Sequence, residues 1–466
     1  MKKWLVAILM VCCFWSAVGL SGPSKAEAAT PVNPNASAIT KSLLNYIAGL
    51  SGKYTLAGQH DKPGSTTAAF NQAKTITGQY PALWGSDMGF TSSGLDTMNN
   101  RQGVVNEAKS KWAANSVVTL TWHMCKPGTT APCSWDGNVY NSPLTSTQWT
   151  QIVTPGTTLY NQFISRIDEA VPYLQQLRDA GVPVLWRPFH EMNGSWFWWG
   201  GNTTNSKKLY QIMYDRYTNV YGLNNLIWVW NVDRPSSGAP SNYYPGAGYV
   251  DILSMDIYDN DFNSSYYNTM VSLAAGKPIA LGEVGNLPTP SILDAQPNWA
   301  YFMAWTEHLT GSNTNTQIQS TYWASRVITQ NEVAVPVAGA ANKAYNKSAY
   351  SGTVESASYP PSLAVDGNGS TRWASAWQNQ DWFYVDLGSV QPMSMVKLQW
   401  EAAYAKKFQI QLSNDNISWW TVYTDENGTG GVQYVTFPST SARYVKLYAY
   451  ERATTYGYSL YEFEVY

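Results

Sequence analysis

Two glutamates stand at the ends of apolar segments, where their carboxyl groups could act together. Glu191 directly follows the segment Pro183–His190, and Glu283 lies near the end of Pro278–Gly285. A carboxyl that stays protonated beside one that stays ionised can supply a proton donor and a nucleophile, which is the pairing that cleavage of a glycosidic bond requires. Either glutamate alone could instead be a structural carboxylate paired with an arginine, so the prediction depends on the pair.

Four consecutive aromatic residues follow the first glutamate. They occupy positions 196–199, after an Asn-Gly-Ser turn at 193–195. Sugar rings present C–H faces that stack on aromatic side chains, so aromatic residues beside a carboxylate favour a carbohydrate-binding cleft. Core packing is the alternative. Because four consecutive side chains cannot all face one way, we expect at least one of these rings to line a cleft.

The segments that carry these residues indicate an α/β fold. Eight short apolar runs predict strands, and helical patterns at Leu159–Ala180 and Ser206–Tyr221 lie between some of them. The expected strands are Tyr54–Gln59, Ala82–Asp87, Ser116–His123, Pro183–His190, Leu226–Asn231, Asp251–Tyr258, Pro278–Gly285 and Tyr301–Glu307. Alternation of this kind predicts a (β/α)8 TIM barrel over residues 29–335, with active groups at the carboxyl ends of its strands. The long gap after the third strand, which contains Trp135, predicts an insertion on that face.

A second domain of different character follows. A connector of small residues at 336–342 precedes β-rich segments separated by Gly, Asn, Asp and Ser turns. The clearest of these segments are Trp382–Leu387, Met395–Trp400, Phe408–Leu412, Val432–Phe437 and Arg443–Tyr448. They predict an all-β sandwich over residues 343–466.

Composition excludes several classes of protein. Hydrophobic residues make up 44% and aromatic residues 14% of the 466 residues, which excludes a mainly disordered chain. The formal net charge is −2 and no Lys/Arg run is present, so nucleic acid is not an expected partner. Two lysines, an apolar run and a small-residue site at Ala26–Ala28 predict a signal peptide over residues 1–28 and a secreted, extracellular protein with no membrane attachment after cleavage. An uncleaved membrane anchor is the alternative.

Two cysteines remain after the predicted cleavage. Cys125 and Cys133 lie eight residues apart in a loop-like stretch, and in an oxidising compartment they are expected to form one disulfide. A metal site is the competing interpretation, but two thiols in a chain with four histidines make a poor zinc site.

The longest motif carries a family resemblance. The sequence RPFHEMNGSWFWWG at 187–200, with LGEVG at 281–285, resembles glycoside hydrolase family 26 over about residues 40–335. The best-populated activity of that family is endo-β-1,4-mannanase. The resemblance implies a retaining reaction, with Glu191 as general acid/base, Glu283 as nucleophile and carboxyl groups about 5–5.5 Å apart. It implies no cofactor for catalysis.

The resemblance also implies substrate-binding residues in the barrel. His190 would hold substrate or the neighbouring carboxyl, although a structural histidine is the alternative, and Trp196 corresponds to the family's platform tryptophan. Tyr258 corresponds to the tyrosine that hydrogen-bonds the nucleophile, and Arg187 could donate to Glu283 and favour its ionised form. The remaining candidates are Trp305 beneath the sugar at the cleavage point, His123 as a subsite contact, and, with weaker support, Trp84, His60 and Asp259.

Three functions are compatible with these motifs. The first is a monomeric, secreted endo-1,4-β-mannanase whose partner is β-mannan, including galactomannan and glucomannan. The second is a β-1,4-xylanase or mixed-linkage β-glucanase on the same fold, since family 26 contains both. The third is a non-catalytic polysaccharide-binding protein, which the presence of both glutamates argues against. Whether cleavage is internal or from chain ends depends on loops that the motifs do not define.

The C-terminal domain resembles another family. Asp366–Trp373, Trp382–Leu387 and the closing Tyr461–Tyr466 are similar to the coagulation factor 5/8 C-type (discoidin) sandwich and to carbohydrate-binding module family 32. That resemblance implies a structural calcium held by Asp366, Thr371 and Glu462, and a turn-only Asp366 is the alternative. Sugar contacts are expected among Trp377, Trp400, Tyr404, Trp419, Trp420 and Tyr456, without a choice between them, and some of the six must be core residues.

Overall fold

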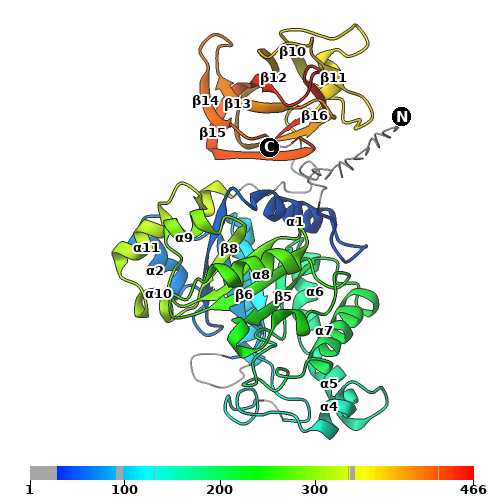
Figure 1. The fold of residues 1–466 in the computed structure, drawn as a ribbon, viewed down its shortest axis with the longest axis vertical. Coiled ribbons are helices and arrows are strands. Elements are labelled where there is room, and N and C mark those ends of the chain that lie inside the picture. Colours follow the sequence, from blue (N-terminus) through cyan, green and yellow to red (C-terminus); the bar gives the residue numbers. More distant parts are fainter. Residues whose placement is uncertain (1–28, 91–97, 131, 334, 336–341, 429) are drawn as a thin grey trace, which may run out of the picture.

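The computed structural model contains a parallel barrel followed by an antiparallel sandwich (Figure 1). It describes residues 29–90, 98–130, 132–333, 335, 342–428 and 430–466. The predicted signal peptide and all of the predicted connector except Asn342 therefore lie outside the described residues. Within the described part, no helix is long and apolar enough to span a bilayer.

All eight predicted barrel strands are present. They are β1 Thr55–Asp61, β2 Leu83–Asp87, β3 Val117–Thr121, β4 Val184–Arg187, β5 Leu226–Asp233, β6 Ile252–Ile257, β7 Ile279–Val284 and β8 Trp299–Ala304. They pair in parallel in chain order, and β1 pairs with both β2 and β8, which closes the barrel. The short strand β9 (Val327–Ile328) also pairs with the start of β1. Every residue of these strands is buried, as expected for parallel strands covered on both faces.

Helices cover the outside of the barrel and fill the loops at its ends. The α-helices are α1 Ala38–Leu50, α2 Ala68–Thr77, α3 Arg101–Ala113, α4 Ser146–Ile152, α5 Thr158–Asp168, α6 Val171–Asp179, α7 Asn205–Asp215, α8 Ser264–Ala274, α9 Pro290–Ala295, α10 His308–Gly311 and α11 Asn315–Tyr322. Shorter helical turns are η1 Met98–Asn100, η2 Arg216–Val220, η3 Pro235–Ser237, η4 Pro240–Asn242, η5 Gln330–Glu332 and η6 Pro361–Ala364.

The helix predicted over Leu159–Ala180 is two helices, so that prediction was wrong in its continuity. The chain breaks between α5 and α6, where Pro172 occupies the first turn of α6. Proline lacks a backbone N–H, so it is tolerated in a first turn but would interrupt a continuous helix. The helix predicted over Ser206–Tyr221 is α7 continued by the π-helical turn η2.

The predicted insertion after β3 is also present. It contains α4 and the disulfide that joins Cys125 and Cys133, and its Tyr140 forms an isolated β-bridge with Phe197. The disulfide prediction is therefore confirmed, and both sulfur-bearing residues are buried. The bridge brings this insertion against the loop that follows β4, which is the loop that carries Glu191.

The C-terminal domain is an antiparallel sandwich with its own core. Its strands are β10 Ser348–Ser351, β11 Trp373–Ala374, β12 Asp381–Trp400, β13 Ala405–Ser413, β14 Trp420–Asp425, β15 Val432–Arg452 and β16 Ser459–Val465, in the order β11-β16-β12-β15-β13-β14 with β10 beside β12. Two pairs of predicted strands are joined here into the long strands β12 and β15, whose pairing shifts register where each was expected to end. β-Bulges of this kind bend a strand without ending it.

The sandwich lies against the end of the barrel where the strands begin. Lys53, just before β1, places its Nζ 3.8 Å from Asp425 Oδ2 at the end of β14, and β15 contacts α1 and η5. Figure 1 shows the sandwich beside α1. The carboxyl ends of the strands lie at the opposite end of the barrel, so the sandwich leaves that face open.

Candidate active site

A cleft of about 740 Å³ opens at the carboxyl ends of the barrel strands. All four histidines of the chain contribute to its lining, together with aromatic and acidic side chains. The lining residues are His60, Lys62, Asp87, Phe90, His123, Trp135, Tyr140, His190, Glu191, Trp196, Phe197, Tyr258, Glu283, Trp305, Glu307 and His308.

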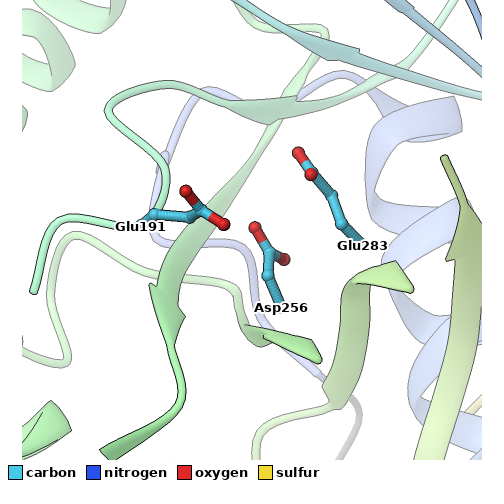
Figure 2. Close-up of side chains that lie close together, drawn as sticks. All are labelled: Glu191, Asp256 and Glu283. Atoms are coloured by element: carbon cyan, nitrogen blue, oxygen red, sulfur yellow. The ribbon is translucent and has the colours of Figure 1, made fainter. Parts of the chain in front are cut away.

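Both predicted catalytic glutamates lie in this cleft and face each other. Glu191 follows β4, whereas Asp256 and Glu283 lie near the ends of the adjacent strands β6 and β7, and Figure 2 shows the three carboxyl groups turned toward a common region. One oxygen from each of the three lies within 4.8 Å of the others. This separation agrees with the short carboxyl spacing of retaining glycosidases, about 5–5.5 Å, and is shorter than the roughly 6.5–9.5 Å that an inverting enzyme needs to admit a water molecule.

Glu191 is held in a protonated state at neutral pH. Burial, followed by the negative charges of Glu283 and Asp233, raises the pKa of its carboxyl to about 8. The indole N–H of Trp196 donates to Glu191 Oε2 at 2.6 Å and partly opposes this shift. A carboxyl with a raised pKa is protonated below that pH, so Glu191 can donate a proton where an ordinary glutamate could not.

Glu283 receives donors on both carboxylate oxygens. Arg187 Nη2 donates to Oε1 at 2.5 Å, and the hydroxyl of Tyr258 donates to Oε2 at 2.6 Å. Hydrogen bonds to both oxygens fix the orientation of this carboxyl group. The predicted contacts of Arg187 and Tyr258 with Glu283 are therefore present in the structure.

Asp256 completes this arrangement from the end of β6. Its Oδ2 accepts a hydrogen bond from Arg187 Nη1 at 3.1 Å, and its Oδ1 accepts one from Asn231 Nδ2 at 2.7 Å. A Cβ atom at Gly282 would lie 2.5 Å from Asn231 Nδ2 and 2.6 Å from Asp256 Oδ1, so only glycine fits before Glu283. Arg187 thus donates to the carboxyl groups of both Asp256 and Glu283.

The turn that carries Glu191 is strained. Phe189 and Glu191 both have positive φ angles, 51° and 50°, in a region that non-glycine residues rarely occupy. Two hydrogen bonds hold this turn: Glu191 N–H donates to Asn231 Oδ1 at 2.7 Å, and Trp199 Nε1–H donates to His190 O at 2.8 Å. Backbone strain of this kind persists only where the surroundings hold it, and it is common at active sites.

The four consecutive aromatic residues divide between cleft and core. Trp196 and Phe197 line the cleft, as we expected of at least one ring, whereas Trp198 and Trp199 are fully buried. Trp305 also lines the cleft and stacks on His60, with ring centroids 3.9 Å apart. These rings supply apolar surfaces of the kind that sugar rings contact.

The histidine predictions are only partly supported. His123 and His190 line the cleft, and both nitrogens of His190 have partners, His123 Nε2 at 2.9 Å and Thr121 Oγ1 at 3.2 Å. The ring therefore does not hold the Glu191 carboxyl within the described structure. His60 lies in the cleft, whereas Trp84 is a buried core residue that donates to Thr66 O, and Asp259 is an exposed residue outside the cleft lining.

The sequence reasoning missed Asp87, Asn231 and Asp256. Each of them lies in or at the end of a predicted strand, so the argument that identified Glu191 and Glu283 could have found them. Their functions depend on contacts with side chains from other strands, which no local motif reveals.

On the sandwich, Asp366, Thr371 and Glu462 lie together as expected. Thr371 Oγ1 is 2.8 Å from Asp366 Oδ2, and burial, followed by the charge of Asp366, raises the pKa of Glu462 to about 7. Both carboxylate oxygens of Glu462 are buried without a hydrogen-bond partner in the described structure. This set of hard oxygen donors is compatible with a calcium ion.

The six aromatic candidates on the sandwich differ in exposure. Trp377 is 60% exposed and Tyr456 57% exposed, and their rings lie perpendicular with centroids 5.5 Å apart. Trp400 is buried in the core, as expected of some of the six, so it is not a sugar contact. Trp420 is 38% exposed, Trp419 is covered by Lys446 Nζ at 3.8 Å from its ring centroid, and Tyr404 is partly buried.

Comparison with known families matches both domains. Residues 32–332 match the model of glycosyl hydrolase family 26, and residues 346–463 match that of the F5/8 type C domain. The match to family 26 covers more than half of the chain. The domain bounds expected from the sequence differ from these matches by a few residues and stay a prediction.

Individual relatives agree with these family matches. The chain is 34% identical over 312 residues to the mannan endo-1,4-beta-mannosidase of Thermothelomyces thermophilus, covering 65% of this chain and 62% of the relative. It is 31% identical over 336 residues to the enzyme of the same name from Bacillus subtilis, covering 66% of this chain and 90% of the relative. The solved structure of GH26A from a Muricauda species has 40% identity and a TM-score of 0.61, covering 64% of this chain and 98% of that one.

Proposed function

This chain belongs to glycosyl hydrolase family 26, and from that premise we propose that it is a retaining endo-1,4-β-mannanase that cleaves mannan, galactomannan and glucomannan. The observation that carries the proposal is the pair of facing carboxyl groups within 4.8 Å, one with a raised pKa and one that accepts a hydrogen bond on each oxygen. The names of the relatives support mannan as the substrate.

The geometry supports a double displacement. In the first step, Glu283 attacks the anomeric carbon while the Glu191 carboxyl gives its proton to the leaving oxygen, which forms a glycosyl ester on Glu283. Arg187 and Tyr258 orient the attacking carboxylate through their hydrogen bonds. In the second step, the Glu191 carboxylate accepts a proton from a water molecule that attacks the same carbon and releases Glu283.

The change of charge during the reaction suits Glu191 for both steps. The negative charge of Glu283 helps to raise the pKa of Glu191 before the first step. Once Glu283 has become a neutral ester, this repulsion is gone, so Glu191 is more stable as the carboxylate that the second step needs. The two residues need no cofactor for this chemistry.

The substrate class is tested with purified protein on linear mannan, galactomannan, xylan and barley β-glucan, following reducing ends and solution viscosity together. The proposal predicts reducing ends from both mannans and a rapid loss of galactomannan viscosity, since internal cuts shorten chains fastest. Activity confined to xylan or β-glucan would support the second candidate, a xylanase or mixed-linkage glucanase. No activity on any of the four would support a non-catalytic polysaccharide-binding protein.

We also propose that the sandwich binds polysaccharide through Trp377 and Tyr456. These two rings are exposed and form a corner, and the indole N–H of Trp377 donates to Glu355 Oε1 at 3.3 Å, which holds one ring in place. Aromatic faces beside polar groups suit the stacking of sugar rings. Binding to insoluble polymer would raise the local substrate concentration for the barrel.

Trp377→Ala should therefore reduce retention on insoluble mannan by at least about tenfold while hydrolysis of soluble mannopentaose stays unchanged, because the cleft lies at the other end of the barrel. Retention is measured by sedimentation with polymer. Trp323→Ala is the matched control, since Trp323 is also 60% exposed but lies at the end of α11 on the barrel. Equal retention of both variants would refute the assignment of this surface.

We propose calcium as the ion of the sandwich, held by Asp366, Thr371 and Glu462 with backbone carbonyls. Support comes from the two buried, unpartnered oxygens of Glu462 beside a second carboxylate. A bound cation would compensate both charges and stabilise the fold that binds it.

Adding calcium to EDTA-treated protein should raise the Tm of the sandwich by roughly 10 °C at a hundredfold excess over the Kd. Calorimetry measures this shift, and magnesium at the same concentration should give little of it because it prefers a smaller, octahedral site. Glu462→Gln should remove the response. A calcium shift that persists in this variant would place the ion elsewhere.

We propose that residues 1–28 direct export and are removed. The buried disulfide between Cys125 and Cys133 supports an oxidising compartment, where such bonds persist. Mass spectrometry of protein from the culture medium should find the N-terminus at Ala29, and an intact N-terminus would contradict removal. That the mature protein is monomeric stays a prediction.

A further inference from the structure

Asp87, at the carboxyl end of β2, is a buried carboxylate that only accepts hydrogen bonds. Its Oδ1 accepts from the backbone N–H of Gly89 at 2.6 Å and of Phe90 at 2.9 Å. Its Oδ2 accepts from the backbone N–H of His123 at 3.0 Å and faces the ring Nδ1 of the same residue at 2.6 Å. Burial alone would raise the pKa of Asp87, but His123, His60 and the N–H of Gly89 lower it below its ordinary value, so the group is ionised at neutral pH.

An ionised carboxylate fixes the proton of its histidine partner. Because Asp87 has no proton to give, the short contact requires a proton on His123 Nδ1. The other nitrogen of this ring, Nε2, lies 2.9 Å from His190 Nε2, and one proton must lie between them. When both rings are neutral, His123 Nε2 is the acceptor and His190 Nε2–H is the donor.

The chain of contacts continues past His190. With its proton on Nε2, His190 has an acceptor nitrogen, Nδ1, 3.2 Å from the hydroxyl of Thr121. This hydroxyl has one proton and also lies 3.0 Å from Arg187 O, so it donates to His190 only by turning away from that carbonyl. Asp87, His123, His190 and Thr121 therefore form one hydrogen-bonded chain whose direction is set by Asp87. All four residues are almost completely buried, although Asp87, His123 and His190 also border the cleft.

These hydrogen bonds reach the strained turn that carries Glu191, the proposed acid/base residue. His190 lies between Phe189 and Glu191, the two residues with positive φ. The backbone of the turn is held by Asn231 and Trp199, and the side chain of His190 is held by His123 and Thr121. If the donors and acceptors along these hydrogen bonds were exchanged, the contacts that hold the His190 side chain at the centre of this turn would change.

We propose that Asp87 is a positioning residue for Glu191, which acts by fixing the proton of His123 and, through His190, the turn that presents the Glu191 carboxyl. This inference rests on the proposed role of Glu191 as acid/base. It concerns a residue outside the catalytic pair, on a different strand, that touches Glu191 only through two histidines.

Asp87→Asn tests this proposal because it should exchange the donors and acceptors along these hydrogen bonds while the side chain keeps nearly the same shape. The amide oxygen is expected to stay toward Gly89 and Phe90, because the opposite orientation would place the amide N–H₂ against two backbone N–H groups instead of one. The amide then donates to His123 Nδ1, and His123 carries its proton on Nε2. His190 then accepts at Nε2 and donates from Nδ1 to Thr121.

Long-range ¹H–¹⁵N spectra of tag-free protein read this change directly, since the chain has only four histidines to assign. We expect a proton on His123 Nδ1 in the parent protein and none on that nitrogen in Asp87→Asn. A parent protein without a proton on Nδ1, or a variant that keeps it, overturns the proposal. This readout does not depend on activity, so it is independent of the proposed function.

Kinetics test the connection to Glu191. In Asp87→Asn, kcat on mannan should fall about tenfold, whereas turnover of a dinitrophenyl β-mannobioside, whose leaving group needs little protonation, should fall much less. The matched control is Asp61→Asn, a buried carboxylate at the end of β1 that accepts only from the backbone of Ala69 and Phe70. Asp61→Asn should lower the stability of the fold, but it should change neither the histidine spectra nor the ratio of the rates on mannan and on the dinitrophenyl substrate.

Two kinetic outcomes would overturn the proposal. One is an equal loss of turnover on both substrates in Asp87→Asn although the His123 proton has moved from Nδ1 to Nε2. This would mean that the hydrogen bonds from Asp87 do not affect Glu191. The other is a change of the rate ratio in Asp61→Asn, which would make the effect a general consequence of lost stability. Failure of the proposed function itself would appear separately, as an absence of any leaving-group dependence in Glu191→Ala.

Discussion

Replacing Glu283 by alanine should abolish hydrolysis of both mannan and activated aryl mannosides, with kcat lowered by about 10⁵-fold. The reason is that Glu283 forms the covalent bond to the sugar, so no leaving group can bypass its loss. Its two donors, Arg187 and Tyr258, would remain in place and keep the cavity polar. Initial rates on mannopentaose and on a dinitrophenyl β-mannobioside measure both losses.

Azide distinguishes the role of Glu283 from a structural one. In Glu283→Ala, azide can occupy the space of the lost carboxylate and attack the anomeric carbon directly, which gives an α-glycosyl azide of inverted configuration. In Glu191→Ala, the matched variant, azide attacks the covalent intermediate and gives the β-azide. Product configuration is read by ¹H NMR. A β-azide from Glu283→Ala would contradict a covalent nucleophile at this position.

Replacing Glu191 by alanine should lower kcat on mannan by about 10²–10⁴-fold and affect formation of the intermediate from dinitrophenyl substrates far less. Only the polymer has a leaving oxygen that needs a proton in the first step. Comparison of the two substrates in pre-steady-state experiments measures this difference, and an equal loss on both would refute the assignment of Glu191 as the acid.

The pH profile gives a second test of Glu191. Because its pKa is raised to about 8, the parent protein should lose mannan hydrolysis as the pH rises through that value and the proton is lost. In Glu191→Ala, this alkaline decline should disappear from the residual activity. Persistence of the same decline in the variant would assign it to another group.

Much of the catalytic site could be predicted from short apolar runs. The runs at Pro183–His190 and Pro278–Gly285 contain β4 and β7, and the closed barrel places the ends of all eight strands on one face. For this reason, strand position alone brought Glu191 and Glu283 together. The contacts of Arg187 and Tyr258 with Glu283 followed from the family resemblance.

The parts that could not be predicted depend on contacts between distant segments. Trp196 and Trp198 are both tryptophans in one motif, yet one lines the cleft and the other is fully buried, because the insertion after β3 covers one side of that loop. The meeting of His123 and His190 likewise depends on the pairing of β3 with β4. Neither contact leaves a local signal in the sequence.

The sandwich shows a similar limit. Gly, Asn and Ser residues between apolar runs suggested separate strands, but the register shifts within β12 and β15 absorb those residues as bulges. A bulge and a turn have much the same composition, and only the partner strand decides between them.

The most direct test of the account is the configuration of the first product. Hydrolysis of mannopentaose by the parent protein is followed by ¹H NMR within the first minutes, before the anomers equilibrate. Two facing carboxyl groups within 4.8 Å predict that the β-anomer appears first and the α-anomer grows later by mutarotation. Appearance of the α-anomer first would show inversion and would contradict Glu283 as a covalent nucleophile.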